Sequence, residues 1–232
     1  MNRYKQRQED YELLGELTYQ KGVSGFLTRS DSGCCEKPAL GSKDLIFLGP
    51  GIGSIEQKDL NRLISFHGYL TSGAFIGLQM LFLGKRLLNV REKERIHVQC
   101  ETINCIPDSF QIIAGTTIGN KGLIIRNTGK LAATITRHTS PGESAPGVRL
   151  ILDPKKTKNF PKLHAWYLNT QKVAHEVVIA ILREAGENVY SYKFISAPVF
   201  AKEAKKVRIC TACGEPFVEG NSCDRRCPEC SK

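Results

Sequence analysis

Residues 66–80 read FHGYLTSGAFIGLQM, in which a short polar loop punctuated by glycines passes directly into an apolar helix. The loop brings the imidazole of His67 and the hydroxyl groups of Tyr69 and Thr71 close to the first turn of that helix. The first N–H groups of a helix have no partner within it, so such a cluster suits an anion or a metal-bound ligand. The alternative is structural: the glycines shape a turn and His67 is an ordinary histidine near the surface.

The pattern on both sides of this stretch predicts a mixture of helices and strands. Residues 54–57 read SIEQ, a capping box that predicts a helix to about Ser65. Residues 95–102 alternate between apolar and polar as a strand does, and Asp108 is placed to cap a helix over 109–114. Further strands are expected at 45–48, 123–126, 131–138, 148–152 and 189–195, with a long amphipathic helix over 163–184. The fold class predicted is α+β, a sheet packed with helices.

The formal net charge of +10 is concentrated in the middle of the 232-residue chain. Residues 51–200 hold 19 basic and 11 acidic side chains, whereas residues 1–50 are balanced. A positive field of this kind favours anionic partners without naming them. The N-terminal residues are polar, and the most apolar run, 74–83, is too short to span a bilayer. The sequence therefore predicts a cytoplasmic protein without a membrane partner.

Two C-x-x-C pairs near the C-terminus, Cys210/Cys213 and Cys227/Cys230, are separated by thirteen residues. Zinc binds four thiolates tetrahedrally, and each C-x-x-C turn supplies two of them, so the spacing predicts one structural zinc ion. With four thiolates bound, the metal has no open position for catalysis. A pair of disulfides is the alternative, which a reducing cytoplasm disfavours. Cys223 is a fifth candidate that could replace one of the four ligands.

The charge of the cysteine-rich tail bears on its partners. Residues 201–232 hold seven basic and five acidic side chains, and zinc with four thiolates would add −2, which brings the tail close to neutral. Phe217 is its only aromatic residue. Nucleic acid is therefore not an expected partner, since it would require basic and stacking side chains. We divide the chain into an N-terminal helical extension (1–50), an α+β core (51–200) and a linker with a zinc-binding tail (201–232).

Several short motifs occur in an order that resembles the FmdE family of formylmethanofuran dehydrogenase subunits. The segments that carry the resemblance are residues 66–73, 101–111, 115–120, 129–132 and 148–149, together with the cysteine tail. The resemblance runs from about residue 54 to the C-terminus. It implies an α+β core that forms a homodimer, with a treble-clef-like zinc finger attached. It also implies a link to the molybdenum or tungsten enzyme that makes formylmethanofuran.

The first loop departs from the pattern of that family at positions suited to metal ligation. The family pattern is His-Gly-His-Leu-Cys-Pro-Gly, and here Tyr69 stands for the second histidine, Thr71 for the cysteine and Ser72 for the proline. Thr116 stands where the family's glycine turn carries a further cysteine. Hydroxyl groups are poorer zinc ligands than thiolate and imidazole. The resemblance therefore implies a degenerate metal site in the core.

The motif loops are expected to meet in one polar cleft. Its candidate residues are His67, Tyr69, Thr71, Cys105, Asp108 and Thr116. His67 and Cys105 offer two good ligands and Asp108 a weak third, so the cleft is expected to hold at most one weakly bound second metal. The alternative is that Cys105 is a small buried hydrophobe and Asp108 a helix cap.

Three functions remain open from the sequence. The first is an accessory or binding subunit of the family's type, which is not catalytic by itself and whose cleft accepts an anionic small molecule. The second is a nucleic-acid or protein adaptor that acts through the zinc finger. The third is a metalloenzyme that uses His67 and Cys105, which requires a base close to a reactive thiol. The family match and the loss of motif ligands favour the first.

Overall fold

The computed structural model of the chain describes residues 44–139, 144–198, 206–218 and 225–231. The strands are β1 (Leu45–Gly49), β2 (Gly53–Glu56), β3 (Ile96–Cys100), β4 (Leu123–Ile125), β5 (Ala132–Arg137), β6 (Ser144–Leu152), β7 (Tyr190–Pro198), β8 (Val207–Ile209) and β9 (Pro216–Val218). The helices are α2 (Gln57–His67), α3 (Ser72–Leu87), α4 (Ile106–Ala114), α5 (Pro154–Thr157), α6 (Pro161–Tyr167), α7 (His175–Ala185) and the 3₁₀ turn η1 (Gly186–Val189). Residues 1–43 of the expected N-terminal extension, and Cys223, lie outside the described residues.

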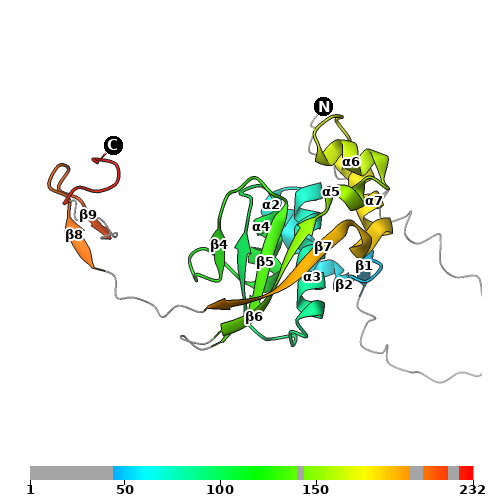
Figure 1. Cartoon of the computed structure of the whole chain (residues 1–232), viewed down its shortest axis with the longest axis horizontal. Helices are drawn as coiled ribbons and strands as arrows, with labels where there is room; N and C mark the ends of the chain where they lie inside the picture. The colour runs from blue at the N-terminus through cyan, green and yellow to red at the C-terminus, as the bar shows by residue number, and fades with distance from the viewer. Residues whose placement is uncertain (1–43, 140–143, 199–205, 219–224, 232) are drawn as a thin grey trace, which may run out of the picture. The chain divides into compact units, whose positions relative to one another are not determined.

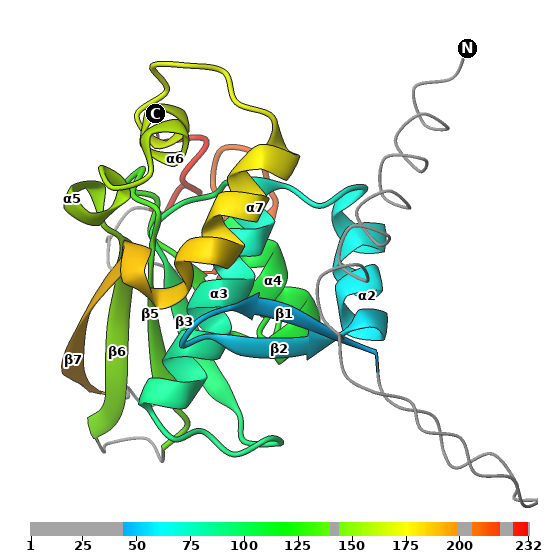
Figure 2. The same cartoon turned by 90° about the vertical axis from the view of Figure 1, so that its right-hand side faces the viewer.

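The core is built on a five-stranded sheet in the order β4-β3-β5-β6-β7 (Figure 1). β3 and β4 are parallel, and the other neighbours are antiparallel. Helices α2, α3, α4 and α7 lie on one side of this sheet (Figure 2). The alternation predicted for β3 is confirmed, because Ile96, Val98 and Cys100 are buried while His97 and Gln99 are partly exposed. The core therefore has the α+β architecture that the sequence predicts.

Helix α3 is the centre of the core, and it is buried along most of its length. Its glycines permit this, because they let neighbouring elements approach the helix closely. A Cβ atom on Gly77 would lie 2.5 Å from the Ile106 carbonyl oxygen, and one on Gly84 would lie 2.5 Å from Ile135 Cδ1. None of the described helices, α3 included, has both the length and the apolar character needed to cross a membrane.

A single buried polar group, the Gln79 amide, ties α3 to three other elements. Gln79 Nε2 donates to the carbonyl oxygens of Leu48 (2.7 Å) and Leu182 (2.8 Å). Its Oε1 accepts from the hydroxyl of Tyr190 at 2.7 Å. Both Gln79 and Tyr190 are almost fully buried. The amide thereby links β1, α7 and β7 through α3, with every polar atom of the group hydrogen-bonded.

The prediction that a helix begins at the capping box of residues 54–57 is wrong. Residues 53–56 instead form β2, which pairs with β1 so that Ile46 lies opposite Ile55. The turn between them uses glycines with positive φ, at 133° for Gly49 and 106° for Gly53. Burial of Leu48 and Ile55 under the core stabilises this hairpin, and that long-range packing outweighs the local capping signal. The helix α2 begins only after the hairpin, at Gln57.

The single long helix predicted over 163–184 is also wrong, because two helices occupy this region. α6 ends at Tyr167, and Asn169 follows in the left-handed conformation with φ of 54°. A residue in this conformation cannot continue a right-handed helix, and asparagine tolerates it better than most. The second helix, α7, begins at His175. This break matters for the site, because it places His175 at a helix start instead of mid-helix.

On the sheet, a buried carboxylate is held by a two-pronged ion pair. Arg149 Nε lies 2.6 Å from Glu101 Oε1, and Arg149 Nη2 lies 3.0 Å from Glu101 Oε2. The hydroxyl of Thr128 donates to Glu101 Oε2 at 3.2 Å. Hydrogen bonding to Arg149 is the main reason why the pKa of Glu101 falls below its ordinary value of 4.5. The same pair raises the pKa of Arg149.

This lowered pKa predicts an acid-dependent stability difference between the wild type and a Glu101→Gln variant. A carboxyl whose pKa is depressed by folding stabilises the fold above its unfolded pKa, and this contribution is lost as the pH falls through the folded pKa. At neutral pH we expect the variant to be less stable by about 1.5–3 kcal/mol, the range for hydrogen bonds to charged groups. Urea denaturation of both proteins should show this difference shrinking below about pH 4.5. A difference that is constant with pH would contradict the assignment.

Candidate functional site

The core site begins with a pairing of His67 and Asp108. His67 is the last residue of α2, and Gly68 ends that helix with φ of 95°, its N–H bonded to the Ile64 carbonyl. Asp108 lies in the first turn of α4, which begins at Ile106 and not at residue 109 as predicted. The capping role predicted for Asp108 is therefore wrong. Its Oδ2 instead lies 2.5 Å from His67 Nδ1, across 41 residues of sequence.

A second histidine, His175, joins the site from the start of α7. Its Nδ1 lies 2.8 Å from Ser72 Oγ and accepts the backbone N–H of Ser72 at 3.2 Å. Because Nδ1 accepts this backbone hydrogen bond, neutral His175 carries its hydrogen on Nε2. The Tyr69 ring lies between the two histidines, with ring centroids 5.5 Å from His67 and 5.9 Å from His175. Both imidazoles are thus anchored through Nδ1 around one tyrosine.

Thr71 and Cys105 flank the first turn of α3. Thr71 is the N-cap of that helix, and its hydroxyl accepts the N–H of Ala74 at 3.2 Å. Cys105 precedes α4 and lies against Gly73, where an added Cβ atom would come within 3.1 Å of the Cys105 Cβ. The absence of a side chain at position 73 therefore allows the start of α3 to approach the thiol. Ser109 Oγ reinforces this contact by donating to the Ala74 carbonyl at 2.6 Å.

Thr116 is placed differently from the other candidates. Its side chain is buried, and its hydroxyl donates to the Phe110 carbonyl at 2.9 Å. This hydrogen bond gives a partner to a carbonyl group near the C-terminal end of α4. Within the part of the chain that the structure describes, the contacts that join His67, Tyr69, Asp108 and His175 do not include Thr116. Its convergence on the cleft remains a prediction.

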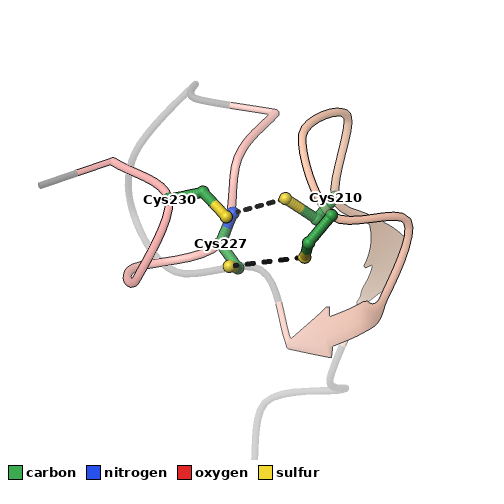
Figure 3. Close-up of side chains that lie close together, drawn as sticks. Cys210, Cys227 and Cys230 are labelled. Atoms are coloured by element: carbon green, nitrogen blue, oxygen red, sulfur yellow. Dashed lines mark hydrogen bonds between the residues drawn. The ribbon is translucent and has the colours of Figure 1, made fainter.

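Among the described residues, one group of histidine, cysteine and acidic side chains is arranged to hold a metal, and it lies in the tail. The ligand atoms of Cys210, Cys213, Cys227 and Cys230 all lie within 4.8 Å of one another. The labelled cysteines Cys210, Cys227 and Cys230 turn toward one another in Figure 3. Tetrahedral zinc with bonds of 2.3 Å would separate its sulfur ligands by about 3.8 Å. The 4.0 Å between the sulfurs of Cys213 and Cys227 is close to this and far beyond a disulfide bond.

The tail folds around the first cysteine pair as a small hairpin of β8 and β9. The turn is completed by Gly214, with φ of 75°, whose N–H donates to the Cys210 carbonyl at 2.9 Å. The N–H of Cys227 points at the Cys210 sulfur, 3.3 Å away. At the second pair, the N–H of Cys230 bonds to the Cys227 carbonyl at 3.0 Å, which forms a tight turn. The second C-x-x-C segment therefore contacts a sulfur of the first through its backbone as well as lying close to it through its own sulfurs.

The thiols of Cys210 and Cys230 have pKa values shifted in opposite directions. Backbone hydrogen bonds from Cys213 and Cys227 lower the pKa of Cys210 to about 6. The neighbouring thiols, Cys227 first, raise the pKa of Cys230 to about 12. A divalent cation at the centre would stabilise all four thiolates and release protons on binding. The cysteine cluster can thus hold a metal ion of the kind that prefers thiolate ligands.

A family model described as FmdE, molybdenum formylmethanofuran dehydrogenase operon, matches residues 66–195, which is more than half of the chain. The chain belongs to the FmdE family. The match covers the residues of the core site, from the loop at His67 to His175 in α7, and it ends within β7. It confirms the resemblance that the motif segments indicate.

Two individual proteins extend this comparison. A tungsten formylmethanofuran dehydrogenase FmdE-like protein from Syntrophus aciditrophicus has a crystal structure similar to this fold. Its TM-score is 0.62 at 25% identity, and the match covers 75% of this chain and 91% of that one. A probable S-adenosyl-L-methionine-binding protein from Archaeoglobus fulgidus is 30% identical over 114 residues, 45% of this chain. The chain spans only 30% of the length of that relative.

His175 and Ser72 are the site residues that sequence reasoning missed. The His175 imidazole meets Ser72 across 103 residues, so no local spacing could indicate the contact. A break in the apolar pattern after Leu168 was the available signal. It would have placed His175 at the N-terminus of a new helix, where a polar side chain is exposed to neighbouring loops.

Proposed function

We propose that this FmdE-family chain is an accessory or binding subunit that is not catalytic by itself. In this proposal its core site accepts an anionic small molecule, and its tail is held by one structural zinc ion in a treble-clef-like finger. The observation that carries the proposal is the anchoring of both core histidines through Nδ1, by Asp108 and by Ser72. This leaves Nε2 of each ring as the nitrogen available to a ligand. The excess of basic side chains in residues 51–200 favours an anion.

A metalloenzyme based on His67 and Cys105 is less well supported. Catalytic zinc takes three protein ligands and an open position. The described contacts pair His67 with Asp108 and set Cys105 against Gly73, without a third imidazole or thiolate in contact with both. The alternative that the tail acts as a nucleic-acid or protein adaptor is also less well supported, because no contact among the described residues favours it. A weakly held second metal in the core stays compatible with the binding function.

The first ligand to test is inorganic phosphate, a small anion, and the second is S-adenosyl-L-methionine, which is suggested by the name of the relative and carries a net positive charge. Isothermal titration of the full chain should show binding of phosphate. His67→Gln and His175→Gln should each weaken that binding by roughly tenfold, which corresponds to one lost hydrogen bond to a charged group. His164→Gln is the matched control, because the His164 ring contacts Thr157, outside this site. Equal affinity in all variants would place the ligand elsewhere, and the absence of phosphate binding, with or without binding of S-adenosyl-L-methionine, would contradict the anion-binding proposal.

The assembly is proposed from the family and from the surface of the core. A homodimer is supported by large apolar side chains that stay exposed, among them the paired rings of Tyr192 and Phe194 on β7. Sedimentation equilibrium that shows only monomer at micromolar concentration would contradict it. A molybdenum or tungsten enzyme of the formylmethanofuran dehydrogenase kind is the proposed larger partner, in the cytoplasm. Co-purification from a native extract would test that partnership.

A further inference from the structure

The five-stranded sheet ends in a long strand with a free edge. β7 is last in the strand order, and among the described strands it pairs with β6 alone (Figure 2). The strand at the opposite edge, β4, has three residues, whereas β7 has nine. A long edge strand offers unpaired N–H and C=O groups to another strand, and proteins usually shorten, blunt or cover such an edge. The edge of β7 is therefore a candidate interaction surface.

The hydrogen bonds around β6 show which backbone groups of β7 point to the free edge. The Val189 carbonyl accepts the N–H of Asp153 at 2.9 Å, so residue 189 directs its backbone toward β6. Leu152, which lies opposite Tyr190, donates its N–H to the Leu131 carbonyl at 3.1 Å, on the far side of β6 from β7. Backbone groups alternate between the two sides of a strand. The residues that direct theirs to the free edge are therefore 190, 192, 194, 196 and 198.

Only the middle of this edge is free to pair. Lys156 Nζ, in α5, donates to the Tyr190 carbonyl and so engages the first of these residues. At the other end, Pro198 has no N–H to donate. Residues 192, 194 and 196 each keep an outward N–H and C=O that no hydrogen bond within the described residues uses. This free segment is symmetric about Phe194.

The same segment carries exposed aromatic side chains. Tyr192 and Phe194 are 49% and 57% exposed, and their ring centroids are 5.8 Å apart. By the alternation of strand side chains they share a face of β7 with Tyr190, which is buried and bonded to Gln79 of α3. The apolar face of the core therefore continues along β7 to a point where the described helices no longer bury it.

We propose that two copies of the chain pair through β7, antiparallel about a two-fold axis at Phe194, and so join their sheets into one. This proposal rests on the homodimer of the proposed function and names its interface. Phe194 then faces Phe194 of the second copy, and Tyr192 faces Ser196 of the second copy. Each facing pair exchanges two backbone hydrogen bonds, so every N–H and C=O of the free segment gains a partner. A two-fold interface requires a self-complementary patch, which the symmetry of this segment provides.

Neighbouring registers of the two strands are less favourable. Moving the axis one residue toward the N-terminus sets Lys193 opposite its own copy, and like charges in that position repel each other. Moving it one residue toward the C-terminus sets Tyr192 opposite Pro198, which lacks an N–H. With the axis at Phe194, Lys193 instead faces Ile195 of the second copy, against which the apolar stem of the lysine packs.

The area of this interface predicts a dimer of moderate affinity. Aromatic side chains bury about 150–250 Å² each, so the exposed halves of the four rings contribute roughly 300–500 Å². With the paired backbone added, the total stays at or below about 1,200 Å², the low end of stable interfaces. We therefore expect a dimer with a dissociation constant in the micromolar range.

Sedimentation equilibrium of the full chain with zinc, from about 1 to 100 µM, tests the surface. The wild type should be dimeric in the upper part of this range. Phe194→Asp removes two rings and sets two carboxylates opposite each other, which should weaken dimerisation by at least about tenfold. Ile124→Asp on β4 is the matched control, because Ile124 is 55% exposed at the other edge of the sheet, and it should dimerise as the wild type does.

The outcomes separate this interface from the functions on which it rests. A dimer that survives Phe194→Asp would leave the homodimer in place and overturn the interface through β7. A wild type that stays monomeric would overturn both. Phosphate binding by Phe194→Asp should match that of the wild type, since residue 194 lies outside the core site, and melting curves should show that both variants are folded.

A cysteine at the axis tests the register. Phe194→Cys should place two thiols opposite each other with Cα atoms about 5.5 Å apart, within reach of a disulfide bond. Mild oxidation should then give a dimer joined between the two residues 194, which mass spectrometry identifies. Tyr192→Cys is the matched control, because the two residues 192 would be offset by about 13 Å along the strands and should not join. Cross-linking at 192 instead of 194, or at neither position in a protein that dimerises, would overturn the proposal.

Discussion

The wild-type chain is expected to retain one zinc ion through dialysis, and a Cys227→Ser variant is expected to lose it. Cys227 is one of four cysteines whose sulfur atoms lie within 4.8 Å of one another. Apparent zinc-binding free energies of small four-ligand sites are about 10–16 kcal/mol, so loss of one ligand should cost roughly a quarter of that, or about a hundredfold or more in affinity. Because the described tail is little more than the β8–β9 hairpin and two turns, residues 206–218 and 225–231 should lose their ordered structure with the metal. Elemental analysis and the dispersion of the tail's amide NMR signals measure the two effects.

The matched control for this experiment is Cys105→Ser, a cysteine-to-serine change in the core. If the tail holds the zinc, Cys105→Ser should keep the wild-type zinc content. Loss of zinc in Cys105→Ser with retention in Cys227→Ser would place the metal in the core. That result would revive the metalloenzyme alternative and contradict the structural role of the tail.

Gln79→Leu is expected to destabilise the core by about 3–5 kcal/mol, although leucine matches the size and apolar surroundings of the site. The substitution leaves the carbonyl groups of Leu48 and Leu182 and the hydroxyl of Tyr190 buried without their partner. Each such group costs about 1–3 kcal/mol, with some relief from relaxation of the surroundings. Equilibrium unfolding in urea, monitored by circular dichroism, measures the change.

Two further single variants and one double variant identify the source of this loss of stability. Tyr190→Phe removes only the hydroxyl and should cost about 1–3 kcal/mol. Its effect should largely vanish when combined with Gln79→Leu, because the two side chains act in one network. Gln171→Leu, in an exposed segment, should change the free energy of unfolding by less than about 0.5 kcal/mol. A Gln79→Leu protein as stable as the wild type would show that the buried amide does not hold β1, α7 and β7 together.

The parts of the fold that could be predicted are those whose signal is local. The alternation of β3 and the apolar run of α3 each follow from the burial of neighbouring positions along one element. The four tail cysteines were likewise predictable, because each C-x-x-C turn fixes the spacing of two sulfurs within a few residues. In these cases the residues that decide the structure are close together in the sequence.

The parts that were mispredicted depend on partners far along the chain. Ser54 to Gln57 carries a helix-start signal, but pairing with β1 and burial of Ile55 decide its conformation. Asp108 was predicted both to cap a helix and to lie in the cleft with His67. The cap is wrong, and its carboxylate instead lies 2.5 Å from the Nδ1 atom of His67, 41 residues away. His175 depends in the same way on Ser72. Hydrogen bonds of this kind form only once the core has brought α2, α3, α4 and α7 together.

X-ray absorption at the zinc edge of the purified full chain tests the central claim most directly. The four-cysteine tail predicts one zinc ion per chain surrounded by four sulfur atoms at about 2.3 Å. Nitrogen or oxygen neighbours at about 2.0–2.1 Å would instead place the metal on the histidines of the core. A spectrum with those lighter neighbours, or a folded tail that contains no metal, would contradict a binding subunit held by a structural zinc.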